Sequence, residues 1–146
     1  MIDKTDAKIL SEYLKDSRQS LREIARKVDV AVGTVLIRTK RMEKEGIIRG
    51  YTAVLDHEKL GYELIAITEL NVSKGKLLEV DREVAKIPTT CAVYDVTGIT
   101  DAIVIAKFKS REELSNFTKA LLAIPYVERT NTHTVLTTIK EDFRLT

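Results

Sequence analysis

The first part of the chain carries apolar side chains at three- and four-residue spacing, a pattern typical of short amphipathic helices. Residues 3–14 predict one helix, which Asp3 or Thr5 can cap. Ser20 and Glu23 form an S-x-x-E pattern, in which the hydroxyl and the carboxylate satisfy two backbone N–H groups at a helix start. The apolar residues that follow predict a second helix over residues 21–28.

A third helix is predicted over residues 32–45, because apolar positions share one face and Gly46 follows as a stop. Only residues 29–31 separate it from the second helix, as in a helix-turn-helix. The side chains predicted to face the core are Val35, Thr39 and Met42. The residues predicted to contact DNA are Gly33, Thr34, Leu36, Ile37, Arg38, Lys40, Arg41 and Lys44. Such a helix is suited to the major groove of double-stranded DNA.

Charge supports this interpretation over that of an ordinary surface helix. Residues 1–50 hold 12 Lys and Arg against 8 Asp and Glu, whereas residues 51–146 hold 12 against 14. The positive field therefore lies with the predicted helix-turn-helix. Exposed Leu36 and Ile37 leave two interpretations open, contact with thymine methyl groups or packing against a neighbouring protein surface.

β-branched and aromatic residues follow the third helix. Residues 47–55 predict a wing or a linking strand, and the polar segment that follows predicts a turn-rich junction. We expect a DNA-binding domain over residues 1–50, a linker over residues 51–61 and a second domain over residues 62–146.

The second domain contains an internal repeat with a period of 37 residues. Leu77, Val80, Val84, Ile87 and Pro88 recur as Leu114, Phe117, Leu121, Ile124 and Pro125. Each copy predicts a helix flanked by apolar strands, which gives a ferredoxin-like βαββαβ domain in an α+β fold. Both helices cover one sheet face. Apolar residues occur in both strand registers, so we expect the other face to be buried against a second copy of the chain.

Composition excludes several classes of protein. No apolar run approaches the ~20 residues of a membrane span, and residues 1–10 lack a signal-peptide pattern, so we expect a cytoplasmic protein without a membrane partner. The single cysteine, Cys91, excludes an internal disulfide and is expected to be buried. Neither His57 nor His133 has a partner at metal-ligand spacing, and no phosphate loop or nucleophile motif occurs. We expect no cofactor, no metal and no catalysis.

Seven short motifs spread over the chain share the pattern of one family. They are Ile2-Asp3, Asp6-x-x-Ile9-Leu10, Glu23-Ile24-Ala25, Thr34-Val35-x-x-Arg38, Met42-Glu43-x-Glu45-Gly46-Ile47-Ile48-x-Gly50-Tyr51, Asp56-x-Glu58-Lys59-Leu60-Gly61 and Val96-Thr97-Gly98-x-x-Asp101. With them the chain resembles the Lrp/AsnC, or feast/famine, transcription regulators nearly end to end. The resemblance implies an N-terminal winged helix-turn-helix, a strand linker and a C-terminal ferredoxin-like domain that dimerises through its sheet. Dimers of this family often form octamers, and a small effector, commonly an amino acid, binds where dimers meet.

The resemblance implies an effector site near the loop that holds Gly98 and Asp101. Asp101 can accept a hydrogen bond from an α-ammonium group, and backbone N–H groups around Gly98 and Thr100 can bind an α-carboxylate. Thr132 and Thr134 supply nearby hydroxyls if the fold is as expected. The same loop is also compatible with a plain hairpin turn, and the threonines with ordinary strand composition.

The chain differs from the family pattern in the helix-turn-helix turn and in the loop. Asp29 and Ala31 stand where the family usually has Gly and often has a capping Ser, and Ile99-Thr100 stands where an aromatic residue often precedes the Asp. Two other functions remain open at this point. Sirohaem decarboxylases resemble the same architecture, although an enzyme would not need an outward-facing cationic helix. A non-specific DNA-organising protein is the other alternative.

Overall fold

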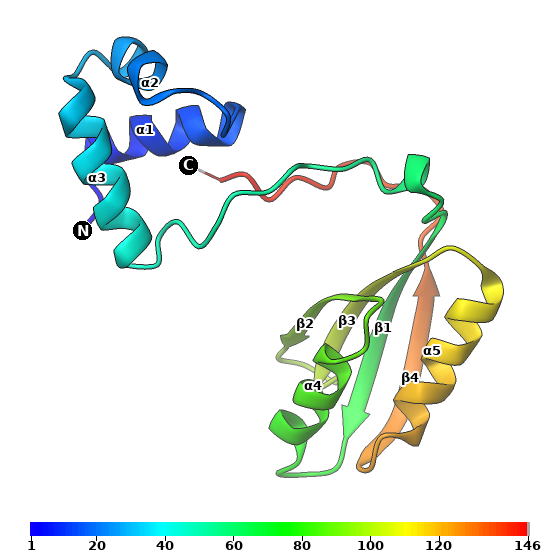
Figure 1. Cartoon of the computed structure of the whole chain (residues 1–146). Helices are drawn as coiled ribbons and strands as arrows, with labels where there is room; N and C mark the ends of the chain where they lie inside the picture. The colour runs from blue at the N-terminus through cyan, green and yellow to red at the C-terminus, as the bar shows by residue number, and fades with distance from the viewer. Residues whose placement is uncertain (146) are drawn as a thin grey trace. The chain divides into compact units, whose positions relative to one another are not determined.

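The chain divides between Val54 and Leu55 into two units with separate hydrophobic cores (Figure 1). The computed structural model describes residues 1–145. The first unit holds residues 1–54 and 141–145, and the second holds residues 55–140. Within the described residues, no helix is long and apolar enough to cross a membrane.

The first unit consists of the three predicted helices, α1 (Lys4–Lys15), α2 (Leu21–Val28) and α3 (Val32–Lys44). Reciprocal capping boxes begin α1 and α2. At α1 the pair is Asp3 with Asp6, and at α2 it is Ser20 with Glu23, which confirms the S-x-x-E prediction. These caps satisfy backbone N–H groups that a helix start leaves without partners.

The turn between α2 and α3 keeps its geometry without glycine. Asp29 adopts the left-handed conformation at φ 59°, which Asp tolerates better than most residues. Ala31 occupies the N-cap position of α3, but its side chain cannot accept a hydrogen bond from the backbone N–H groups at the helix start. Six buried apolar side chains join the helices, and they are Ile9, Ile24, Ala25, Val28, Val35 and Met42. The inward face predicted for α3 is therefore confirmed, and Thr39 is also buried.

The strand expected over residues 47–55 is absent, which corrects the sequence interpretation. The amides of Ile47 and Ile48 both donate to the Met42 carbonyl, so the chain turns at the end of α3. No strand is present between there and the 3₁₀ helix η1 (Glu58–Leu60). β-branched residues favour a strand only when a neighbouring strand pairs with their backbone groups, and the described part of the first unit contains none.

The second unit has the predicted βαββαβ order. Its elements are β1 (Leu64–Val72), α4 (Leu77–Ala85), β2 (Thr90–Asp95), β3 (Ala102–Phe108), α5 (Arg111–Ala123) and β4 (Val127–Thr134). The strands form one antiparallel sheet in the order β2-β3-β1-β4, which confirms the ferredoxin-like arrangement (Figure 1).

Both helices of this unit pack on the same sheet face. The buried core between them is made by Ala66, Leu70, Val72, Val80, Val84, Ala102, Val104, Ala106, Phe108, Phe117 and Leu121. Phe108 and Phe117 contact each other with ring centroids 5.1 Å apart. Cys91 does not belong to this core, which corrects its expected burial. It is exposed on the edge strand β2, where the pairing with β3 is irregular between Thr90 and Ala92.

Candidate nucleic-acid interface and effector loop

The outward face of α3 combines apolar and cationic side chains. Ile37 is 71% exposed and Leu36 is 38% exposed, although both are large hydrophobic residues. Lys40 and Lys44 are exposed on the same helix, and no ion pair involves them among residues 1–145. Gly33 has open space around its Cα, and its position allows close backbone approach. This surface can contact thymine methyl groups and phosphates at once.

The structure gives Arg38 and Arg41 a different environment from the lysines. Arg38 Nη1 lies 2.9 Å from Asp6 Oδ1 and 2.5 Å from Asp3 Oδ2, and Arg41 Nη2 lies 2.5 Å from Asp6 Oδ2. The two arginines of α3 thus contact the start of α1. Direct DNA contact by Arg38 and Arg41 remains a prediction, as it does for the other residues of α3.

Asp6 is the residue that sequence reasoning missed at this site. It is fully buried, and its carboxylate also accepts the Asp3 amide at 3.1 Å. Burial alone would raise the pKa of Asp6, but the hydrogen bonds donated by the Asp3 amide, Arg41 and Arg38 outweigh it and lower the pKa to about 2. A signal was available in the sequence. Asp6 lies three residues before Ile9, on the apolar face of α1, where an unpaired charge would be strongly unfavourable.

The end of α3 is held by hydrogen bonds to aromatic side chains. Tyr13 and Thr39 hydroxyls lie 3.1 Å apart, and the Tyr51 hydroxyl donates to Glu43 at 2.8 Å. The Tyr13 and Tyr51 rings contact each other with centroids 5.6 Å apart. Burial and the nearby Glu43 carboxylate raise the pKa of Tyr51, so its proton stays in this bond. The segment that follows α3 is therefore anchored to the first unit.

The loop between β2 and β3 brings together three of the predicted effector residues, Gly98, Thr100 and Asp101. Asp101 Oδ2 accepts the Val72 amide at 2.8 Å, and the Thr100 hydroxyl donates to the Leu70 carbonyl at 3.0 Å. Gly98 has φ +115°, a conformation that favours glycine. In this chain the loop thus caps the end of β1, and Asp101 performs part of that capping.

The structure does not bring Thr132 and Thr134 to that loop within one chain. On β1, Thr132 pairs with Thr68 and Thr134 pairs with Ala66. The loop instead contacts Leu70 and Val72. Thr68 and Ala66 precede Leu70 by two and four residues. At ~3.3 Å per strand residue, Thr132 and Thr134 therefore lie about 7 and 13 Å from the level of Leu70 on the sheet. The Thr132 hydroxyl is also engaged, 3.2 Å from that of Thr68 beneath the helices.

The sheet face that α4 and α5 leave uncovered has an apolar centre. It is formed by Ile65, Ile67, Ala92, Tyr94, Ile103 and Ile105, and register places Ile67 beside Ile105 and Ile103 beside Tyr94. A polar group borders it, in which Glu69 Oε2 lies 2.9 Å from His133 Nε2 and 2.8 Å from Asn131 Nδ2. These hydrogen bonds, first the one from His133, lower the pKa of Glu69. In the described chain, no three His, Cys, Asp or Glu side chains form a group that could hold a metal ion.

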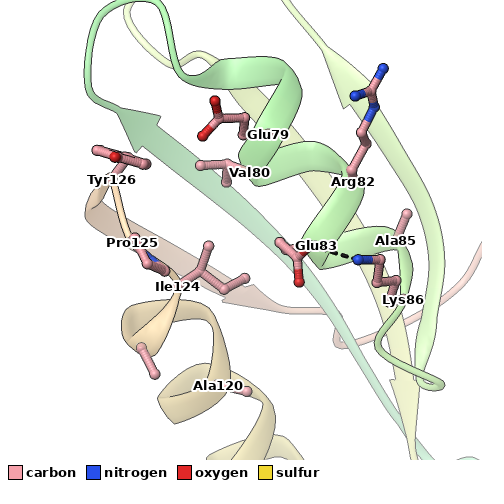
Figure 2. Close-up of a pocket in the computed structure, with 11 residues that line it drawn as sticks. Glu79, Val80, Arg82, Glu83, Ala85, Lys86, Ala120, Ile124, Pro125 and Tyr126 are labelled. Atoms are coloured by element: carbon pink, nitrogen blue, oxygen red, sulfur yellow. Dashed lines mark hydrogen bonds and ion pairs between the residues drawn. The ribbon is translucent and has the colours of Figure 1, made fainter.

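A groove of about 950 Å³ lies between α4 and α5. Figure 2 shows Val80 and Ile124 in the groove, with Ala120 on α5 and the Glu83–Lys86 ion pair at its rim. Its lining includes none of the predicted effector residues. The groove is therefore a feature of the helix face that is separate from the effector loop.

Comparisons with known proteins match both halves of the chain. A winged helix-turn-helix DNA-binding model matches residues 2–49, and an Lrp/AsnC ligand binding domain model matches residues 65–145. An HTH-type transcriptional regulator of Pyrococcus abyssi is 50% identical over 145 residues, which cover 99% of each chain. HTH-type transcriptional regulator FL11 of Pyrococcus horikoshii is 38% identical over 144 residues, 99% of this chain and 95% of FL11.

Among solved structures, a transcriptional regulator from Neisseria meningitidis in complex with L-methionine is similar throughout. The TM-score is 0.90 at 30% sequence identity, with 100% of this chain and 97% of that chain covered. The similarity includes both units and the segment that joins them. The likeness therefore extends to the order of a DNA-binding unit followed by a ligand-binding unit.

Proposed function

The chain belongs to the Lrp/AsnC family of transcriptional regulators, with a helix-turn-helix DNA-binding domain and a ligand-binding domain, and we propose that it binds specific promoter sites as a dimer. Its relatives are named transcriptional regulators, so it is not an enzyme. In the proposal, α3 reads base edges in the major groove, and an amino acid modulates binding through the second unit.

The observation that carries specific recognition is the exposed apolar side chain of Ile37, which precedes the cationic positions on α3. A side chain that large gains little from 71% exposure to water, whereas a thymine methyl group provides an apolar partner. Lys40 and Lys44, which follow Ile37 on α3, can bind phosphates and fix the orientation of the helix. Together these groups support a base-reading surface more than a purely electrostatic one.

Footprinting and binding measurements with an Ile37→Glu variant test this proposal. We expect wild type to protect a pseudo-palindrome at its own promoter, and Ile37→Glu to weaken operator binding at least tenfold, since it adds a charge next to the DNA phosphates. The matched control is Leu78→Glu, because Leu78 is an exposed apolar residue on α4 in the other unit. Uniform coating of DNA by wild type would instead favour the DNA-organising function.

The uncovered sheet face supports dimerisation. Its isoleucines form an apolar surface of the kind that soluble proteins bury against a partner, and a two-fold dimer would present two α3 helices. Half-sites are then expected one helical turn, or a multiple of it, apart. An Ile105→Lys variant should sediment as a smaller species than wild type, while Leu122→Lys, on the exposed side of α5, should not. Equal sedimentation of Ile105→Lys and wild type would contradict this interface.

An amino-acid effector is supported by the ligand-binding family model and by the methionine complex of the Neisseria relative. Calorimetry against the twenty amino acids, with L-methionine included, tests it. Asp101→Asn is the variant to compare, because an amide oxygen can still accept the Val72 amide while the carboxylate charge is lost. We expect one or a few amino acids to bind wild type and to bind Asp101→Asn at least tenfold more weakly. If no amino acid binds wild type, the effector proposal fails.

A further inference from the structure

The four cations of α3 fall into two groups that differ in their surroundings. Lys40 and Lys44 are exposed, whereas Arg38 and Arg41 are 29% and 38% exposed at the side chain and both contact carboxylates of α1. The two arginines are three residues apart and therefore share one side of α3. The side that carries the arginines is thus the side that rests on α1.

We propose that Asp6, together with Asp3, is a positioning residue that withholds Arg38 and Arg41 from DNA phosphates and leaves recognition to the exposed apolar and lysine side chains of α3. This inference rests on the proposed function, because it concerns how the DNA-binding surface of that function is composed. It assigns to the start of α1 an influence on DNA specificity that acts through the arginines.

The contacts of Asp6 leave little freedom to either arginine. Asp6 is fully buried, and each of its oxygens has its own guanidinium, with Oδ1 contacted by Arg38 and Oδ2 by Arg41. Arg38 also bridges to Asp3, whose Oδ1 in turn accepts the Asp6 amide at 2.9 Å. Arg41 Nε is buried without a hydrogen-bond partner in the described chain, so this atom of the guanidinium group faces the protein.

A phosphate group that draws both guanidinium groups away leaves the buried Asp6 carboxylate with only the hydrogen bond from the Asp3 amide. Such a charge is strongly unfavourable in a protein interior, so the intramolecular pairing competes effectively with DNA. The same two contacts join α1 to one side of α3 and fix the rotation of α3 about its own axis. Fewer free cations mean fewer counterions released from DNA, and this lowers the affinity for DNA of any sequence.

The test measures the salt dependence of binding by the full chain. Fluorescence anisotropy would follow binding to the footprinted operator and to a scrambled duplex of equal length and composition at several KCl concentrations. For Asp6→Asn we expect tighter binding to the scrambled duplex and a slope of log affinity against log salt that is steeper by about 1–2, since each added phosphate contact contributes about 0.9. The ratio of operator affinity to scrambled affinity should fall several-fold.

Two further variants separate positioning from general effects. Asp3→Asn keeps a good helix cap and removes one of the carboxylates that hold Arg38, so its slope should steepen by up to about 1 even if Asp6→Asn does not fold. Asp16→Asn is the matched control for charge. It removes one carboxylate from the same unit, at the other end of α1, where the partner is Arg18.

The outcomes for specificity and for positioning are distinguishable. Equal affinity of wild type for the operator and the scrambled duplex would overturn the proposed specific recognition. Wild type can be specific while the salt slopes of Asp6→Asn and Asp3→Asn equal that of Asp16→Asn. That result would overturn the positioning role and leave the proposed specific recognition intact. A parallel loss of both affinities at an unchanged slope would show that Asp6 only stabilises the fold. Restoration of the wild-type slope by Asp6→Asn combined with Arg38→Gln and Arg41→Gln would support positioning.

Discussion

We expect the carboxyl group of Asp81 to make the stability of the second unit fall as pH rises from about 4 to about 7. Asp81 lies on α4 and faces Asp95 at the end of β2, and its Oδ1 is buried without a hydrogen-bond partner in the described residues. Burial, followed by the hydrogen bond to Asp95 and the charge of Asp95, raises the pKa of Asp81 to about 7. An asparagine at this position would be neutral at every pH and could still donate to Asp95.

The sign of the effect follows from the proton count. In the unfolded chain Asp81 releases its proton near its ordinary pKa of 3.8, whereas the folded protein retains it until about pH 7. The unfolded state therefore binds fewer protons in this window, and the free energy of unfolding falls as pH rises from about 4 to about 7. Above that range the contribution stays constant.

The magnitude is bounded by the difference between the two pKa values. A shift from 3.8 to about 7 corresponds to at most ~4 kcal/mol of lost stability above pH 7. Asp81 is partly exposed, so solvent screens the repulsion and we expect about 1–2 kcal/mol. Asp81→Asn should therefore raise the free energy of unfolding by about 1–2 kcal/mol at pH 8 and change it little at pH 4.

Urea unfolding followed by circular dichroism from pH 4 to pH 8, at one protein concentration, measures this difference. Glu79→Gln is the matched control, because Glu79 is an exposed carboxylate on the same helix, and its ion pair within residues 1–145 is the one with Lys76 at 3.4 Å. It should stay within about 0.5 kcal/mol of wild type at both ends of the range. The reasoning is refuted if Asp81→Asn and wild type differ by the same amount at pH 4 and pH 8.

Three other substitutions address local features of the two units. Ala31→Ser adds the missing side-chain cap of α3 in a backbone conformation that suits it, so it should stabilise by about 0.5–1.5 kcal/mol in thermal unfolding; a lower melting temperature would contradict this. Tyr51→Phe removes the hydrogen bond to Glu43 and should destabilise by about 0.5–1 kcal/mol in urea, with no effect expected if that bond is absent in solution. Leu121→Ala removes a fully buried side chain and should cost about 2–5 kcal/mol; a loss below 1 kcal/mol would show that the core collapses around the cavity.

Much of the fold could be predicted because its signals are local. The S-x-x-E pattern at Ser20 and the stop at Gly46 each act within one or two turns of a helix, and each copy of the 37-residue repeat contains the pattern of a single helix. The linker strand was predicted wrongly, since a strand depends on a partner strand that the residues themselves do not reveal. The burial of Cys91 was wrong for a related reason, because an irregular edge strand need not alternate between faces.

The candidate site was predicted only in part. The exposed positions Ile37, Lys40 and Lys44 follow from helical periodicity, and the structure leaves all three at the surface. The predicted effector residues divide between a loop and a strand that one chain does not bring together, and periodicity carries no information about that distance.

The sequence by itself determined the helices, the caps of the first two, the turn between α2 and α3, the succession of elements in the second unit and the identity of the outward face of α3. These depend on backbone propensity and side-chain period, which act between residues close in the chain. Only the tertiary structure decided that Arg38 and Arg41 face Asp6, across separations of 32 and 35 residues, and that Asp81 faces Asp95. Such pairings depend on how α1 packs on α3 and how α4 packs on the sheet, and packing selects among many neighbours that local patterns allow equally.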